Sequence, residues 1–312
     1  MTREIKIIDL DENSIDLTDK VISLGDFDGL HRGHMSLIDK NLEISKKFNL
    51  EPSVLFFKKN SKEVFQHLKY NLSSLEDKIS MAFEKGISTF ALVSFSDEFK
   101  NLSPYDFIKK ILVDRLNAKY IVVGENFTFG LKSKGNVEYL KKLEEEFGYK
   151  TIIIPLRKEN SDIISSTTIR TYLKDGFIDK ANNLLGYNYK IKGKVISGEG
   201  RGRNLGYPTA NLKLDFNYAL PKNGVYFTKV FIDDKQYFAM TDIGTNPTFE
   251  DQEIKIESYI FDFNENIYGK KIILEFIEFV RDDVEFKNAD ELIDQLHFDY
   301  KNIREKIKNY KN

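Results

Sequence analysis

Two hydrophobic patterns follow one another along this chain. In the first, short apolar runs typical of buried strands alternate with longer segments whose apolar residues recur at helical spacing. The expected strands are Val21–Leu24, Ser53–Phe57, Thr89–Val93, Tyr120–Val123 and Thr151–Pro155, and the expected helices are His34–Phe48, Leu75–Lys85, Tyr105–Leu116 and Asn136–Phe147. This alternation predicts a parallel sheet with helices on both faces, which binds ligands beyond the carboxyl ends of its strands. Residues 25–34 and 124–135 each follow a strand and are expected at that edge.

The second pattern begins after Gly186 and lacks helices until the C-terminus. Segments rich in β-branched and aromatic residues are separated by Gly, Pro, Asn and Asp turns, which predicts an antiparallel sheet or small barrel. The expected strands are Tyr189–Ile196, Val225–Ile232, Gln236–Thr241, Ile254–Phe261 and Ile272–Phe279. A final helix over about residues 288–310 carries an apolar stripe, Leu292, Leu296, Ile303 and Ile307, that is expected to pack on the barrel. We therefore expect two domains, 1–187 and 188–312.

Composition narrows the class of function. A length of 312 residues favours two domains, and 47 basic residues nearly balance 49 acidic ones, so no global charge favours nucleic acid or a membrane surface. The absence of Cys fits a reducing cytoplasm, and no apolar run has the length of a signal core or a membrane span. We expect a soluble intracellular protein.

The densest candidate chemistry lies where the first of these strands leads into a helix, in Gly25-Asp26-Phe27-Asp28-Gly29-Leu30-His31-Arg32-Gly33-His34. A helix N-terminus presents free N–H groups and positive dipole charge, and Gly29 and Gly33 allow close approach of a phosphate. Imidazoles at His31 and His34 can stabilise charge on phosphate oxygens during transfer. A zinc half-site or a surface coincidence would show the same spacing, but zinc needs further Cys or His ligands.

Two more segments of the first domain carry candidate site residues. Gly124-Glu125-Asn126-Phe127-Thr128-Phe129-Gly130 is a candidate clamp on a planar ring, with Asn126 as a hydrogen-bonding arm; an ordinary strand-to-helix connection is the alternative. In residues 164–170, Ser165 or Ser166 is expected to cap a helix over Thr171–Lys174 whose end faces a phosphate. Arg170 would neutralise a leaving pyrophosphate, and the alternative is a plain cap with a solvated arginine.

The second domain has its own cluster in residues 198–211, Gly-Glu-Gly-Arg-Gly-Arg-Asn-Leu-Gly-Tyr-Pro-Thr-Ala-Asn. Its glycines and arginines predict a loop that folds over phosphates, although it lacks the Gly-Lys-Ser/Thr of a Walker-type loop; a glycine-rich hairpin is the alternative. Thr209 and Asn211 point the same way on an extended segment, and their oxygens suit Mg²⁺ that also binds ATP phosphates. Glu257 shares a strand face with Lys255 and Tyr259, and its pattern alone indicates an outward charge.

Taken together, these motifs resemble one family, the bacterial bifunctional riboflavin kinase/FMN adenylyltransferase, also called FAD synthetase. The resemblance covers nearly the whole chain and includes the motifs at residues 25–34, 124–130, 165–170, 202–211, 223–226, 243–248 and 257–270. It implies an α/β fold with an N-terminal Rossmann-like nucleotidyltransferase domain on a parallel sheet. A small C-terminal antiparallel β-barrel with a terminal helix would follow.

The resemblance also implies two successive reactions. The barrel would phosphorylate riboflavin to FMN with ATP and Mg²⁺, using Glu257 as the base and Thr209 and Asn211 as metal ligands. The N-terminal domain would then join FMN to AMP from a second ATP, giving FAD and pyrophosphate, with His31, His34 and Arg170 as catalytic residues. The other implied contacts to substrate or nucleotide are Gly25, Phe27, Asp28, Gly33, Asn60, Gly124, Asn126, Phe127, Ser165, Ser166, Thr167, Gly198, Gly200, Arg203, Gly206 and Pro208.

One stretch departs from the family pattern Thr-Phe-x-Pro-His-Pro, because this chain has Phe56-Phe57-Lys58-Lys59-Asn60-Ser61. Asn60 is expected to replace the histidine as a neutral hydrogen-bonding group near the nucleotide. Lys58 or Lys59 is expected to add positive charge there, and the loss of two prolines is expected to loosen the loop. The expected result is an FMN step that outpaces the FAD step.

Three other functions stay open on the sequence. The first is a riboflavin kinase whose adenylyltransferase half is weak or absent. The second is a flavin-binding regulator, which would not need the full set of transfer residues. The third is an adenylyltransferase for another acceptor, such as a pantetheine phosphate, which would leave the second domain unexplained. Separate assays of the two half-reactions distinguish them.

Overall fold

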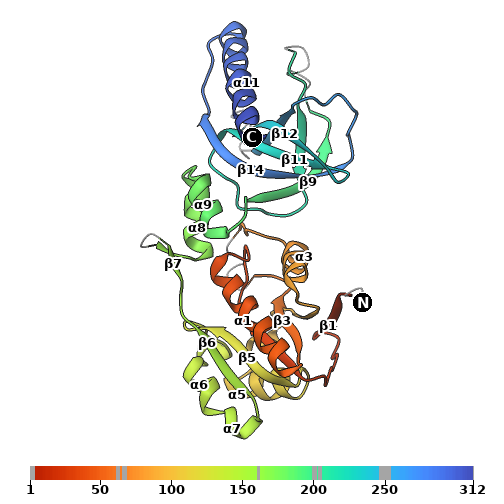
Figure 1. The fold of residues 1–312 in the computed structure, drawn as a ribbon, viewed down its shortest axis with the longest axis vertical. Helices are drawn as coiled ribbons and strands as arrows, with labels where there is room; N and C mark the ends of the chain where they lie inside the picture. Colours follow the sequence, from red (N-terminus) through yellow and green to blue (C-terminus); the bar gives the residue numbers. More distant parts are fainter. Residues whose placement is uncertain are drawn as a thin grey trace. The chain divides into compact units, whose positions relative to one another are not determined.

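The computed structural model describes residues 4–60, 64, 69–159, 162–198, 202, 206–245 and 254–311. The chain divides into two compact units, Met1–Thr168 and Ile169–Asn312, one built on a parallel sheet and the other on a closed barrel (Figure 1). Among the helices in these ranges, none is both long and apolar enough to cross a membrane.

The first unit contains a six-stranded parallel sheet in the order β1-β4-β3-β2-β5-β6. Its strands are β1 (Lys6–Asp9), β2 (Lys20–Leu24), β3 (Glu51–Phe57), β4 (Thr89–Val93), β5 (Ala118–Gly124) and β6 (Lys150–Ile154). After β2 the chain adds β3 and β4 on one side and then returns to place β5 on the other. Ligands bind beyond the carboxyl ends of the strands at such a reversal, which here lies between β2 and β5.

Helices cover both faces of this sheet, as predicted (Figure 1). They are α1 (Arg32–Phe48), α3 (Leu75–Lys85), α4 (Asp97–Lys100), α5 (Pro104–Asp106), the π-helix η1 (Phe107–Val113), the 3₁₀ helix η2 (Leu131–Ser133), α6 (Val137–Lys142) and α7 (Glu144–Phe147). Successive strand residues face opposite sides: Val21 packs in the cluster that includes α1 and α3, whereas Ile22 packs with η1 and α6. A short hairpin of β7 (Lys158–Glu159) and β8 (Asp162–Ile163) follows the sheet.

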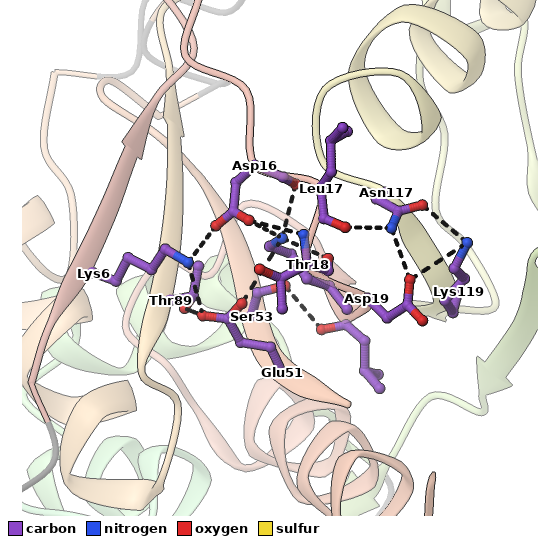
Figure 2. Close-up of polar contacts among 12 residues, drawn as sticks. Lys6, Asp16, Leu17, Thr18, Asp19, Glu51, Ser53, Thr89, Asn117 and Lys119 are labelled. Carbon is purple, nitrogen blue, oxygen red and sulfur yellow. Dashed lines mark hydrogen bonds and ion pairs between the residues drawn. The ribbon is translucent and has the colours of Figure 1, made fainter. Parts of the chain in front are cut away.

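A buried lysine ties the amino ends of the strands to the loop that enters β2. The Lys20 ammonium lies 3.0 Å from the Asp16 carboxylate and donates to the carbonyl oxygens of Asp16 and Thr18 at 2.9 and 2.7 Å. Glu51, 3.8 Å from Lys20, accepts a hydrogen bond from Thr89 (Figure 2). Burial lowers the pKa of Lys20, while Asp16 opposes that shift. This network stabilises the edge opposite the ligand-binding one.

The second unit is a closed six-stranded antiparallel barrel in the order β10-β13-β12-β11-β14-β9. Its strands are β9 (Lys190–Ile196), β10 (Ala210–Leu214), β11 (Gly224–Ile232), β12 (Lys235–Thr245), β13 (Ile254–Ile260) and β14 (Lys271–Asp282). Its helices are α8 (Ser166–Lys174), α9 (Ile178–Leu185) and α11 (Ala289–Lys311). Helix α8 begins in the first unit. Ile303 and Ile307 of α11 are buried against the outside of the barrel, which confirms the predicted packing of this helix.

The structure confirms the predicted fold class and corrects several elements. The helix expected over Tyr105–Leu116 is α5 followed by a π-helix, and the helix expected over Asn136–Phe147 is interrupted at Leu143. The helix expected at Thr171–Lys174 begins at Ser166. Strands β1 and β10 and helix α9 have no counterpart in the sequence-based prediction.

Candidate active sites

The turn from β2 into α1 brings two imidazole rings together at the carboxyl edge of the sheet. His31 caps α1, because its Nδ1 accepts the backbone N–H of His34 at 3.3 Å. The two rings are stacked, with centroids 3.7 Å apart and 16° between their planes. Since Nδ1 of His31 accepts, its neutral ring carries the proton on Nε2. Two ring nitrogens thus accompany the N-terminal amides of α1, an arrangement that suits a phosphate.

Buried residues hold this turn in shape. A Cβ atom at Gly33 would lie 3.1 Å from Nδ1 of His31, so any larger residue would press on that ring. Phe27 is fully buried, and its ring centroid lies 5.2 Å from that of His34. The buried Asp28 carboxylate accepts the backbone N–H of Leu72 at 2.9 Å. These contacts show Phe27 and Asp28 supporting the turn, while their contact with substrate stays a prediction.

The segment that leads into α8 lies against the same turn. The Ser166 hydroxyl donates to the carbonyl oxygen of Asp28 at 2.9 Å. Ser165 accepts the backbone N–H of Thr168 at 3.2 Å and therefore acts as the helix cap. Thr167 is exposed in the first turn, and Arg170 follows in the next. Both candidate serines thus lie beside the His31 turn, whereas their contacts with phosphate stay predictions.

The loop after β5 is held closed by its own contacts. Phe129 and Gly135 exchange two backbone hydrogen bonds, at 3.0 and 2.9 Å. Phe127 is half-buried and stacks on Phe129 with centroids 5.7 Å apart, whereas Asn126 is exposed. A Cβ atom at Gly124 would approach Asn126 Oδ1 to 3.3 Å. Because β5 pairs with β2, this loop and its exposed amide lie at the same edge as the His31 turn.

The loop after β3 borders β2 on its other side and contains Asn60, which is 5% exposed. The contacts of Lys58 differ from the expectation that this lysine adds positive charge near the nucleotide. Its ammonium contacts the carboxylates of Asp9 and Asp11, each at 2.8 Å, and therefore does not provide an uncompensated charge for the nucleotide. Lys59 is exposed.

In the second unit, Glu257 stands between two polar neighbours on adjacent strands of the barrel. It pairs with Asn211 across β10 and β13 and with Asp242 across β12 and β13. The Thr209 hydroxyl donates to Glu257 Oε2 at 2.9 Å. A Cβ atom at Gly198 would lie 2.2 Å from Asn211 Nδ2, so the bare backbone of glycine is needed there. The structure thus brings the candidate base and both candidate metal ligands together.

Asp242 is a member of this group that the sequence analysis does not identify. Burial, together with the nearby carboxylates of Asp283 and Glu257, raises the pKa of Asp242 to about 7. The expected strand ends at Thr241, whereas β12 extends to Thr245, so Asp242 falls outside the predicted strand. Its place beside Glu257 depends on strand register, which the pattern does not reveal.

The rest of the candidate nucleotide loop is partly described. Gly200 and Arg203 lie outside the described residues. Gly206 has a φ of +82°, which favours glycine, and Pro208 is exposed. Between them, the Tyr207 backbone N–H donates to the carbonyl oxygen of Gly202 at 2.8 Å, which leads the chain toward Thr209.

Comparison with known proteins assigns both halves of the chain. A family model described as FAD synthetase matches residues 13–168, and one described as riboflavin kinase matches residues 185–307. The bifunctional riboflavin kinase/FMN adenylyltransferase of Listeria monocytogenes is 36% identical over 289 residues, which cover 91% of each chain. This chain belongs to the bifunctional riboflavin kinase/FMN adenylyltransferase family.

Other similar proteins extend along the same length. The bifunctional riboflavin kinase/FMN adenylyltransferase of Bacillus subtilis is 35% identical, and the alignment covers 89% of this chain and 90% of that protein. The Escherichia coli K12 protein of the same name is 32% identical over 91% and 92%. A crystal structure from Streptococcus pneumoniae, described as a macrolide-efflux protein, is 33% identical with a TM-score of 0.88 and covers 96% of this chain and 99% of that one.

Proposed function

We propose that this protein makes FAD from riboflavin in two steps at two separate sites. Residues 188–312 transfer the γ-phosphoryl group of ATP to riboflavin, giving FMN and ADP. Residues 1–187 then transfer AMP from a second ATP to FMN, giving FAD and pyrophosphate. The observation that carries the proposal is that one chain of this family holds both a stacked histidine pair at a helix N-terminus and a glutamate flanked by Thr209 and Asn211.

In the kinase step, Glu257 accepts the proton of the terminal ribityl hydroxyl as that oxygen attacks the γ-phosphorus of ATP. The bond from this phosphorus to the β–γ bridging oxygen breaks, and ADP leaves. The hydrogen bond from Thr209 holds the Glu257 carboxylate in place. The oxygen donors of Thr209 and Asn211 fit Mg²⁺, which prefers oxygen ligands and, when bound, supplies positive charge to the ATP phosphates. Positioning and charge compensation are the main requirements of phosphoryl transfer.

In the adenylyl transfer step, a phosphate oxygen of FMN attacks the α-phosphorus of ATP and pyrophosphate leaves. The FMN phosphate is already ionised at neutral pH, so this step needs no general base. His31 and His34 donate to the α-phosphate oxygens, where charge builds up, together with the N-terminal amides of α1. Ser165, Ser166 and Arg170 are proposed to contact the phosphates.

We propose that the enzyme works in the cytoplasm, where ATP is available, and that its partners are the small molecules ATP, riboflavin and FMN. The first domain is proposed to hold the adenosine and flavin groups with Asn126, Phe127 and Asn60. Nucleic acid and membranes have no part in either reaction.

The direct test is a time course of the purified protein with riboflavin, ATP and MgCl₂, with riboflavin, FMN and FAD separated by chromatography. FMN is expected first and FAD later, and FAD is expected without delay when FMN is supplied. FMN without any FAD would mean that the protein is a riboflavin kinase with an inactive first domain. A lack of FMN would contradict the proposal for the barrel.

A further inference from the structure

A cluster of charged side chains links three loops at the carboxyl edge of the first sheet. Lys58, directly after β3, donates from Nζ to both carboxylate oxygens of Asp9, at 2.9 and 2.8 Å, and to Asp11 Oδ2 at 2.8 Å. Asp9 ends β1, and Asp11 Oδ1 accepts the backbone N–H of Ser94, which follows β4, at 3.0 Å. We call Lys58, Asp9 and Asp11 the edge clamp, because one cation joins the ends of β1, β3 and β4.

Hydrogen bonds within the edge clamp favour the charged forms of Asp11 and Lys58. Although partial burial opposes ionisation, hydrogen bonds from Lys58 and Ser94 lower the pKa of Asp11 to about 2. Hydrogen bonds to Asp11 and Asp9 raise the pKa of Lys58. The three side chains are 31%, 26% and 33% exposed, and ion pairs of such exposure add little to global stability. The main effect of the clamp is therefore expected on the local path of the loops.

The loop that the clamp fixes leads to a candidate site residue. The Lys58 backbone N–H donates to the carbonyl oxygen of Val93 at 2.9 Å, which extends the pairing of β3 with β4. Asn60 follows two residues later and is buried. Since β3 is the neighbour of β2, this loop borders the turn that carries His31. Because Asn60 lies only two residues after Lys58, fixing Lys58 also restricts the position of the Asn60 side chain.

We propose that Lys58 is a positioning residue for adenylyl transfer, which acts through Asp9 and Asp11 to hold Asn60 against the nucleotide site and does not itself bind phosphate. This inference rests on the proposed function of the first domain. This role differs from that of a lysine whose own charge binds phosphate. A phosphate-binding lysine would gain from losing its carboxylate partners, whereas a positioning lysine depends on them.

The first experiment compares Lys58→Met with Lys46→Met in the full-length protein. Lys46 is exposed in the last turn of α1, has no proposed role in the site, and is the control for lost charge. Lys58→Met is expected to lower kcat/KM for FMN-to-FAD conversion by about tenfold or more, mainly in kcat, because small displacements of a positioning group are costly. Lys46→Met should stay near wild type. Riboflavin phosphorylation by the same chains should not change, and Lys58→Arg should restore part of the loss.

The second experiment separates positioning from direct contact. Asp9→Asn with Asp11→Asn removes the partners but keeps Lys58, and it should reproduce the loss seen in Lys58→Met. Adding Lys58→Met to that pair should cause no further loss, since all three changes break one unit. A wild-type rate in the double variant, or in Lys58→Met, would overturn the proposal. No FAD from the wild-type protein would instead overturn the proposed adenylyltransferase, and the role of the clamp with it.

Discussion

The proposed role of Glu257 depends on its neighbours on β10 and β12. We expect Glu257→Gln to lower the rate of FMN formation by about 10²–10⁴-fold, because the amide keeps the shape but cannot accept the ribityl proton. Conversion of supplied FMN to FAD should stay near the wild-type rate, which is the internal control for folding. Chromatographic assay of each half-reaction measures both. Equal loss of the two activities in a folded protein would contradict the assignment of Glu257 to the kinase step alone.

Asp242 makes the stability of the barrel depend on pH. Burial raises its pKa to about 7 from an ordinary value of 3.8, so the folded state keeps this proton to higher pH than the unfolded state does. Asp242 therefore does not lower the free energy of unfolding below about pH 4, and it lowers that free energy progressively as the pH rises toward about 7. Asp242→Asn mimics the protonated form and should stabilise the protein at pH 8 by on the order of 1–4 kcal/mol, with little gain at pH 4.

Thermal unfolding of both proteins across this pH range measures the effect. The gain in melting temperature on Asp242→Asn should grow between about pH 4 and pH 7 and then level off. A gain that is the same at all pH values would mean that the pKa of Asp242 does not differ between the folded and unfolded states.

The position of a single residue can be predicted from the sequence where it depends on spacing within a short motif. The helix cap at Ser165 and the strand face of Glu257 both follow from motifs a few residues long. The contact of Lys58 with Asp9, and the place of Asp242 beside Glu257, depend on which strands are neighbours and in what register. Alternation along one strand carries no such information.

Among the elements, the loop before β2 is held in part by the buried ammonium of Lys20. We expect Lys20→Met to destabilise the first unit by about 3 kcal/mol, because it leaves the partly buried carboxylates of Asp16 and Glu51 without this partner. Chemical denaturation measures the change. Lys119→Met is the control, since the exposed ion pair of Lys119 with Asp19 belongs to the same loop region. An equal, small effect of both changes would show that Lys20 contributes no more than a surface lysine.

The elements that the sequence misses have specific physical causes. Strand β1 is four residues long and lies at the sheet edge, and Ile7 within it is 47% exposed, so it lacks the apolar run of a buried strand. Strand β10 follows a glycine-rich segment that reads as a loop. In η1, hydrogen bonds between residues five apart shift the helix by one residue, a change that barely alters the spacing of Phe107, Ile111 and Leu112.

Over the whole molecule, the change of hydrophobic pattern and the division into compact units fall at different places. The pattern changes near Gly186, whereas the units divide after Thr168. The reason is α9: the Asn182 side chain donates to the carbonyl oxygen of Phe276 in β14 at 2.9 Å and accepts the Tyr189 N–H at 2.8 Å. A helix can join a barrel by such contacts without sharing its strand pattern.

The two proposed active sites are independent of each other and are linked only by released FMN. The most direct measurement mixes two full-length variants with riboflavin, ATP and MgCl₂. Glu257→Gln alone should form almost no FMN or FAD. His31→Ala with His34→Ala should accumulate FMN but form almost no FAD, because each lost donor costs about 10²–10³-fold in rate. The mixture should form FAD as FMN passes from one variant to the other. FAD formation by the histidine variant alone would show that the stacked histidines are not the adenylyl transfer site.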